Sequence, residues 1–255
     1  DLAFLLMDLI ERGLHQAANI VLNRYLADTQ RIHDLDALAA LPLFMSIRAA
    51  IRAKVTAARL RQARSQAELT HGPRDYAALA KEILVPGKPR LIAIGGLSGT
   101  GKSLLARALA PRLHPLPGAV VFRSDLERKA LFAAGEAEKL PEAAYTTETT
   151  AKVYAVLAEK ARRAVSAGHS VIVDAVFAKP SERSEIAGIA PDAFEGLFMN
   201  ASLDTRLARV ATRSGGDGRR PPGRRARHRA LPEQHRELHR PLSGSLSSRG
   251  GPGGP

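Results

Sequence analysis

Hydrophobic positions divide the chain into two parts with different periodicities. In the first part apolar residues recur at intervals of three and four, as in Leu2, Leu5, Leu6 and Leu9, which is the spacing of amphipathic helices. This spacing continues to about residue 84 and predicts helices only. In the second part short apolar runs alternate with helical patterns. The predicted strands are Arg90–Gly95, Ala119–Arg123, Ser170–Asp174 and Phe194–Asn200, and the predicted helices are 102–113, 125–134, 143–167 and 180–189.

The alternation of strands and helices predicts an α/β fold, in which a parallel sheet carries helices on both faces. Ligands bind such sheets at the carboxyl ends of the strands. The domain boundaries follow from the same pattern: a helical segment over 1–84, a Pro/Gly linker at 85–89, an α/β domain over 90–213 and a tail over 214–255. The tail has no helical or strand period and few apolar residues, and we expect it to be disordered.

Composition narrows the classes of function. The 255 residues include no cysteine, which excludes disulfides and thiolate metal sites, and no apolar run predicts a membrane span or a signal peptide. We therefore expect a cytoplasmic protein. The net charge is +13, and the tail alone carries nine arginines against three acidic residues. Tryptophan is absent and aromatic residues are 4% of the chain, which argues against a surface that stacks on nucleic-acid bases. A tail that binds nucleic acid stays an alternative.

The first strand of the α/β part runs into the pattern Gly-x-x-x-x-Gly-Lys-Ser, formed by Gly96, Gly101, Lys102 and Ser103. A strand before this pattern and a helix after it are the context of a phosphate-binding loop, whose backbone N–H groups surround phosphates. Lys102 would reach the terminal phosphates of ATP, and the Ser103 hydroxyl would bind Mg²⁺. The predicted nucleotide-binding residues are Gly96, Leu97, Ser98, Gly99, Thr100, Gly101, Lys102, Ser103 and Leu104.

Two carboxylates stand at the ends of later strands. Asp174 closes the apolar run Ser170–Val173, where we expect it to order Mg²⁺ or its water shell opposite Ser103. Asp125 follows the second strand, beside Arg123, and is a candidate to accept the proton of a substrate hydroxyl. The alternative for Asp125, or for Ser124, is an N-cap of the next helix. His169, at the start of the third strand, is a weak catalytic candidate.

Three arginines share one face of the helix predicted after the fourth strand, at i, i+3 and i+7: Arg206, Arg209 and Arg213. They could stabilise charge on a transferred phosphoryl group, and a solvated basic face is the alternative. The polar stretch Tyr145–Thr150 is a candidate lining of the acceptor site. A further run of cations over Arg48–Arg64 either binds an acidic partner or is a solvated helix face.

The region from Arg90 to about Ser214 resembles the small P-loop kinases of the AAA_33 and zeta-toxin-like group, which includes gluconate, chloramphenicol and polynucleotide 5′-hydroxyl kinases. The resemblance rests on Gly95–Ser103, Arg123-Ser124-Asp125, Ala167–Phe177 and the arginines after the fourth strand. It implies a P-loop NTPase fold of the kinase type. The catalytic residues would be Lys102, Asp125, Arg206, Arg209 and Arg213, the metal ligands Ser103 and Asp174, and the cofactors ATP and Mg²⁺.

The whole chain resembles the back half of bacterial two-part proteins in which an aminoglycoside-phosphotransferase-like domain precedes such a kinase. The segments Asp1–Leu9 and Leu41–Ala50 look like the last helices of that protein-kinase-like C-lobe. The resemblance implies that the first domain's ATP-binding lobe lies before Asp1. Family members continue past the arginine helix with folded elements, whereas this chain becomes Arg/Gly/Pro-rich, which suggests a frameshift near Ser214 as a hypothesis.

The leading hypothesis is therefore an ATP- and Mg²⁺-dependent phosphotransferase that acts on a hydroxyl of a small molecule. One alternative is a regulatory module that binds a nucleotide and has no acceptor of its own. The other is a kinase of nucleic-acid 5′ ends.

Overall fold

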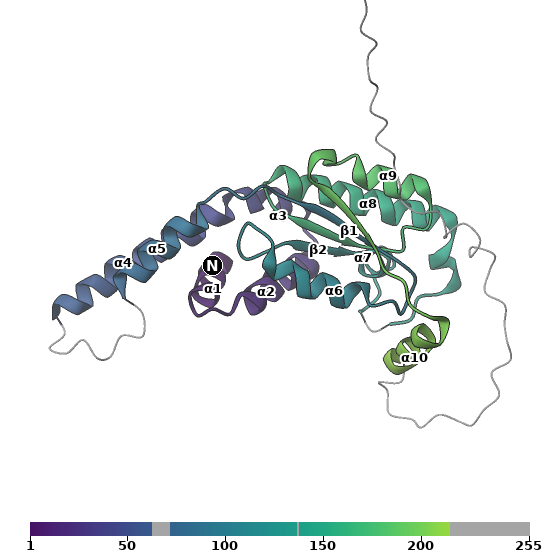
Figure 1. Cartoon of the computed structure of the whole chain (residues 1–255), viewed down its shortest axis with the longest axis horizontal. Helices are drawn as coiled ribbons and strands as arrows, with labels where there is room; N and C mark the ends of the chain where they lie inside the picture. Colours follow the sequence, from purple (N-terminus) through teal and green to yellow (C-terminus); the bar gives the residue numbers. More distant parts are fainter. Residues whose placement is uncertain (63–71, 137, 215–255) are drawn as a thin grey trace, which may run out of the picture. The chain divides into compact units, whose positions relative to one another are not determined.

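The structure is a computed structural model that describes residues 1–62, 72–136 and 138–214 (Figure 1). The first part of the chain is helical: α1 (Leu2–Glu11), α2 (His15–Thr29), α3 (Ile32–Ala37), the 3₁₀ turn η1 (Leu38–Ala40), α4 (Leu41–Gln62) and α5 (Pro73–Ile83). The second part alternates strands and helices: β1 (Leu91–Gly95), α6 (Lys102–Leu109), η2 (Ala110–Arg112), β2 (Val120–Arg123), α7 (Ser124–Leu131), η3 (Glu142–Tyr145), α8 (Thr147–Ser166), β3 (Val171–Asp174), α9 (Pro180–Ala187), η4 (Pro191–Ala193), β4 (Phe194–Phe198) and α10 (Leu203–Ser214).

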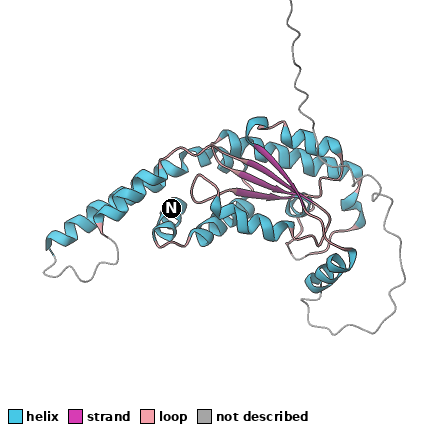
Figure 2. Ribbon diagram, in the orientation of Figure 1, coloured by secondary structure: helices cyan, strands magenta, loops and turns pink. Residues whose placement is uncertain are grey.

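The four strands form one parallel sheet in the order β2-β3-β1-β4, which confirms the predicted fold class (Figure 2). β1 is therefore interior, between β3 and β4. Its last residues pair with the ends of its neighbours, Ile94 with Asp174 and Gly95 with Phe198. Arg123 of β2 pairs with Asp174 from the other side. This register brings the carboxyl ends of the four strands to one edge, beside the glycine-rich loop.

Alternating side chains of the strands build two separate cores. Leu91 and Ala93 of β1 belong to the cluster that includes α8, whereas Ile92 and Ile94 pack with Ala106 of α6 on the other face. Because successive side chains of a strand point to opposite faces, a strand that is apolar at every position is buried on both sides. All five residues of β1 are buried.

The helices α1 to α5 share a core with the α8 face of the sheet. Leu6, Leu22 and Leu35 belong to the same buried cluster as Leu157 of α8 and Val173 of β3. Residues Asp1–Ser214 accordingly form one compact unit. The origin of 1–84 as a remnant of another domain, and the boundary at 85–89, stay predictions.

Two asparagines of α2 pair with the outer edge of β2, which no strand of the described residues covers. The side-chain amides of Asn19 and Asn23 donate to the Ala119 carbonyl at 3.0 and 3.1 Å, and the Val121 amide donates to Asn23 Oδ1 at 2.6 Å. An exposed sheet edge offers unpaired backbone groups of this kind. The asparagines satisfy them as a neighbouring strand would, and they fix α2 against the sheet.

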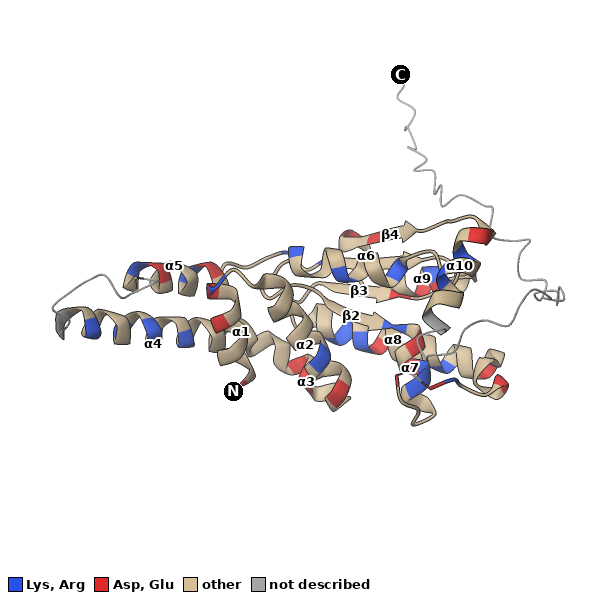
Figure 3. Cartoon of the chain, turned by 90° about the horizontal axis from the view of Figure 1, so that it is seen from below, with Lys and Arg blue, Asp and Glu red and all other residues tan. Residues whose placement is uncertain are grey.

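Basic residues are spaced along α4, as Figure 3 shows. Those nearest α1 and α5 have partners within the fold: the Arg48 guanidinium lies 4.7 Å from the centre of the Phe4 ring, and Arg52 lies 3.7 Å from the Asp8 carboxylate. These two cations therefore hold helices of the chain together. Binding to an acidic partner molecule is not needed to explain a basic residue at these two positions.

Some of the predicted features lie outside the residues that the structure describes, and others can be compared with it. The predicted tail lies outside the described residues apart from Ser214, and the end of the basic run beyond residue 62 lies outside them too. His169 is fully buried just before β3, beyond the end of the strand opposite Asp174, so it does not reach the phosphate-binding loop. Among the helices of the described ranges, none is long and apolar enough to cross a membrane.

Burial lowers the pKa of His169 to about 4 from an ordinary value near 6.5. Between these pH values the unfolded chain binds a proton that the folded chain does not, so the free energy of unfolding falls as the pH falls. We predict a loss of about 3 kcal/mol between pH 7 and pH 4 from this residue. Denaturant unfolding at several pH values measures it.

The matched variant is His169→Gln, which has no titrating ring. Its unfolding free energy should fall less steeply than that of the wild type over the same range, whatever its stability at pH 7. Equal slopes for the two proteins would show that His169 is not responsible.

Candidate nucleotide-binding site

Three glycines shape the loop between β1 and α6 by taking positive φ angles: Gly96 at 133°, Gly99 at 84° and Gly101 at 103°. Side chains with a Cβ rarely adopt these angles. Neighbouring elements also leave no room for a Cβ at two of them. At Gly96 it would lie 2.4 Å from the Met199 carbonyl oxygen, and at Gly99 2.6 Å from the Arg206 carbonyl oxygen. The loop is thus held closely against β4 and α10.

Lys102 and Thr100 both bind back to the loop. The Lys102 ammonium donates to the Leu97 carbonyl at 3.1 Å, and the Thr100 hydroxyl donates to the same oxygen at 2.8 Å. These contacts keep the lysine over the loop that it follows. α6 begins at Lys102, so the partial positive charge of the helix start is added to that of the ammonium at this place.

The Ser103 hydroxyl donates to the Asp174 carboxylate at 2.5 Å. Register explains the contact, because Asp174 pairs with Ile94 at the end of β1, just before the loop. Burial raises the pKa of Asp174, while the Ser103 hydroxyl and the charges of Lys102 and Arg123 act in the opposite direction. The predicted metal ligands are therefore neighbours in the fold.

A hydroxyl and a carboxylate are the oxygen donors that Mg²⁺ takes from a protein when phosphates and water supply the rest of its ligands. The described residues contain no group of three or more His, Asp or Glu side chains that could hold a metal ion. The pair of Ser103 and Asp174 fits a Mg²⁺ that is shared with a nucleotide.

Arg123 connects the end of β2 to two acidic residues of the site. Its guanidinium lies 2.8 Å from the Asp125 carboxylate and 3.7 Å from that of Asp174. α7 begins at Ser124 with Arg123 as its N-cap residue, and within the described part of the chain no side chain caps it. The alternative of Ser124 or Asp125 as the N-cap is therefore wrong, because the Asp125 carboxylate turns to Arg123 instead. That carboxylate is 57% exposed, so a substrate could reach it.

Two of the three predicted arginines of α10 contact the phosphate-binding loop. Arg206 Nε donates to the Ser98 carbonyl at 3.1 Å, and Arg209 donates to the carbonyls of Gly99 and Thr100 at 3.3 and 3.4 Å. The cations thus satisfy loop carbonyl oxygens and hold α10 against the loop. The side chain of Arg213 lies outside the described residues.

The stretch Tyr145–Thr150 has a structural role at the start of α8. Thr146 caps this helix, accepting a hydrogen bond from the Thr149 amide at 3.2 Å. Arg128 of α7 donates to the Ala144 carbonyl and to the Thr150 hydroxyl and lies over the Tyr145 ring. These contacts join α7 to α8.

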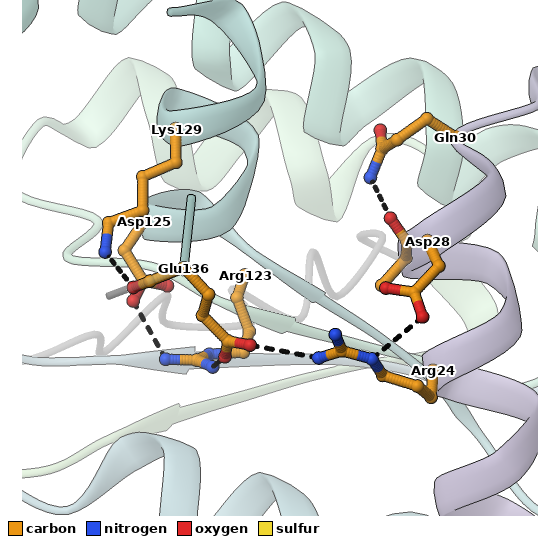
Figure 4. Close-up of polar contacts among 8 residues, drawn as sticks. Arg24, Asp28, Gln30, Arg123, Asp125, Lys129 and Glu136 are labelled. Carbon is orange, nitrogen blue, oxygen red and sulfur yellow. Dashed lines mark hydrogen bonds and ion pairs between the residues drawn. The ribbon is translucent and has the colours of Figure 1, made fainter. Parts of the chain in front are cut away.

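Sequence reasoning missed the contribution of α2 to this region. Glu136 bridges Arg24 of α2 and Arg123 of β2, with oxygen to nitrogen distances of 3.0 and 3.6 Å (Figure 4). No local pattern in the sequence relates Arg24 to residues a hundred positions later. The sequence feature that could have indicated this contact is the pair Asn19 and Asn23, two polar residues on the otherwise apolar side of α2.

Comparison with known proteins identifies the family of this region. The model of AAA_33, described as an AAA domain, matches residues 91–238, which is more than half of the chain. The chain belongs to the AAA_33 family. The match runs beyond Ser214 into the predicted tail, and the frameshift near that residue stays a hypothesis.

The AAA_33 chain is also similar to longer mycobacterial proteins. It is 30% identical over 224 residues to the uncharacterized protein Rv2004c of Mycobacterium tuberculosis and to the uncharacterized protein Mb2027c of Mycobacterium bovis. The alignment covers 85% of this chain and 43% of each relative. The chain thus spans less than half the length of these curated relatives.

We predict that Gly99→Ala lowers the affinity for ATP by about tenfold or more. Its Cβ would push against the backbone of Arg206, and relief of that contact must shift the loop or α10. Isothermal titration with ATP and Mg²⁺ measures the affinity.

Gly168→Ala is the matched control. Gly168 has a φ of 81°, close to the 84° of Gly99, but a Cβ there would meet no atom within 4 Å. Both variants carry the same backbone strain, so an equal loss of affinity in the two would show that crowding at the loop plays no part.

Proposed function

We propose that this AAA_33 domain transfers a phosphoryl group from ATP, with Mg²⁺, to a hydroxyl of a small molecule. The observation that carries the proposal is the contact of Ser103 with Asp174 beside a glycine loop that ends in Lys102. Membership of the family supports a nucleotide-binding, kinase-like domain.

ATP would lie on the loop amides from Gly96 to Leu104, with Lys102 on its terminal phosphates. Ser103 and Asp174 would hold the metal, which supplies charge neutralisation on the phosphate oxygens when it is bound. The raised pKa of Asp174 has a consequence here, since a bound cation would favour the ionised carboxylate. We therefore expect ATP binding with Mg²⁺ to weaken as the pH falls.

Asp125 would accept the proton of the acceptor hydroxyl. In the transfer the hydroxyl oxygen forms a bond to the γ-phosphorus, and the bond from that phosphorus to the β,γ-bridging oxygen breaks. ADP keeps the electron pair of the broken bond, and the proton passes to the Asp125 carboxylate. Arg123 keeps this carboxylate in place through their 2.8 Å contact.

Arg206, Arg209 and Arg213 would stabilise charge on the transferred group. Contacts of Arg206 and Arg209 with loop carbonyls support this role, because they hold α10 against the loop. A small rotation of their side chains would let them exchange these carbonyls for phosphate oxygens.

A regulatory nucleotide-binding module is the second candidate function. The shared core of α1 to α5 with the sheet favours it, because a shift of β3 or α8 on nucleotide binding would reach those helices directly. The longer relatives offer further chain for such a signal to act on. We also propose that a domain of the aminoglycoside-phosphotransferase type precedes this chain. A cytoplasmic location is a further part of the proposal.

Two variants separate these functions. Lys102→Ala should lower ATP affinity by tenfold or more, because it removes a charged contact to phosphate. Asp125→Asn should leave ATP affinity unchanged and lower the rate of phosphate transfer by about 10²- to 10⁴-fold, which is the contribution of a general base. Titration with ATP and single-turnover transfer from γ-labelled ATP measure the two effects.

The matched control is Asp192→Asn, at an exposed aspartate of η4. It should change neither quantity. Normal ATP affinity in Lys102→Ala would exclude this loop as the nucleotide site, and normal transfer in Asp125→Asn would exclude that residue as the base.

A further inference from the structure

A cavity of about 510 Å³ lies between α2 and α7, beside β2 and α6. Its size is that of sites that hold small molecules. One wall comes from the N-terminal helical segment, through α2, and the others come from the AAA_33 domain. Figure 4 shows the polar side chains of α2, β2 and α7 that lie in this region.

Cations outnumber carboxylates on the cavity walls. The cations are Arg24, Arg107, Arg123 and Lys129, and the carboxylates are Asp28 and Glu136. Arg24 is paired with both carboxylates, at 2.9 and 3.0 Å. Arg123 is paired with Glu136 and also with Asp125 and Asp174 outside the cavity.

Arg107 and Lys129 have no carboxylate partner among the described residues. The Lys129 ammonium donates to the backbone carbonyl of Glu136, and the Arg107 guanidinium on α6 makes no hydrogen bond or ion pair with any described residue. Two cations from different helices thus face one cavity without neutralisation. Such an arrangement attracts an anion, and guanidinium binds carboxylate or phosphate with two parallel hydrogen bonds.

Other parts of the lining are apolar, notably Ile20 of α2 and Leu126 and Ala130 of α7. A small ion alone would leave these surfaces exposed to water. The lining fits a molecule with an apolar body and an anionic group.

Arg123 connects the cavity to the reacting groups. It lines the cavity and contacts Asp125 and Asp174, the proposed base and metal ligand. Arg107 lies one helical turn after Ser103 on α6, on the same side of that helix. A molecule in the cavity therefore borders the site of phosphate transfer.

We propose that this cavity binds the acceptor alcohol, and that the acceptor carries a carboxylate or phosphate held by Arg107 and Lys129. This inference rests on the proposed phosphotransferase function. It assigns to α2 a part in acceptor binding, which places the helical segment in the active site of the domain.

The test uses three probes that share an aromatic body: phenyl phosphate, benzoate and the uncharged benzyl alcohol. Isothermal titration of the chain should detect phenyl phosphate or benzoate and show at least tenfold weaker binding of benzyl alcohol. The stronger of the two anions identifies the phosphate or the carboxylate as the preferred group. Equal binding of all three probes would overturn the proposal.

Variants locate the bound anion. Arg107→Gln should weaken binding of the anion about tenfold, since it removes one charge-assisted contact. Glu136→Gln should strengthen it, because a negative charge on the cavity wall, which repels the anion, is gone. Unchanged affinity in Arg107→Gln, or weaker binding in Glu136→Gln, would contradict an anion in this cavity.

Lys102→Ala distinguishes this proposal from the proposed function. The anion should still bind to Lys102→Ala, and ATP should still bind to Arg107→Gln. Loss of anion binding in Lys102→Ala would place the anion on the phosphate loop and overturn the cavity proposal alone. ATP binding that survives in Lys102→Ala would contradict the proposed function. The evidence for an anion in the cavity would then remain valid without it.

Discussion

The contact between Ser103 and Asp174 depends on the parallel register of β1 and β3, and the rest of the site depends on that contact. Ile94 pairs with Asp174, so the strand end that opens the phosphate loop lies beside the carboxylate. Arg123 joins from β2, opposite the same residue. Sheet geometry thus brings together the Ser103 hydroxyl, the carboxylates of Asp125 and Asp174 and the Arg123 guanidinium, which come from three separate stretches of the chain. No local loop geometry could do this alone.

The helical segment belongs to this arrangement because β2 is an edge strand. Asn19 and Asn23 satisfy the backbone groups of that edge, and the apolar side of α2 enters the core beneath it. Once α2 is fixed there, Arg24 necessarily lies next to Glu136 and Arg123. A single packing constraint therefore creates both a stable edge and a cavity with an excess of positive charge.

Much of the fold could be predicted from the sequence. Short apolar runs predicted the strand ends to within one residue, except that the fourth strand ends two residues earlier than predicted, at Phe198. The phosphate-loop pattern located Lys102 and Ser103. The contact of Ser103 with Asp174 could be predicted because the carboxyl ends of parallel strands lie at the same edge of a sheet. Contacts between distant elements could not be predicted, such as Arg206 with the Ser98 carbonyl or α2 with β2, because periodicity shows which side of a helix is buried but not its partner. The alternative of an N-cap at Ser124 or Asp125 was wrong, and the Asp125 carboxylate pairs with the Arg123 guanidinium instead.

We propose that the domain transfers phosphate from ATP to a small alcohol. The direct test is incubation of the chain with γ-labelled ATP, Mg²⁺ and a deproteinised metabolite extract, followed by separation of labelled products. We expect a labelled small molecule with an anionic group besides the new phosphate, formed by the wild type and absent with Lys102→Ala. Release of labelled inorganic phosphate alone, at the same rate with and without the extract, would contradict it.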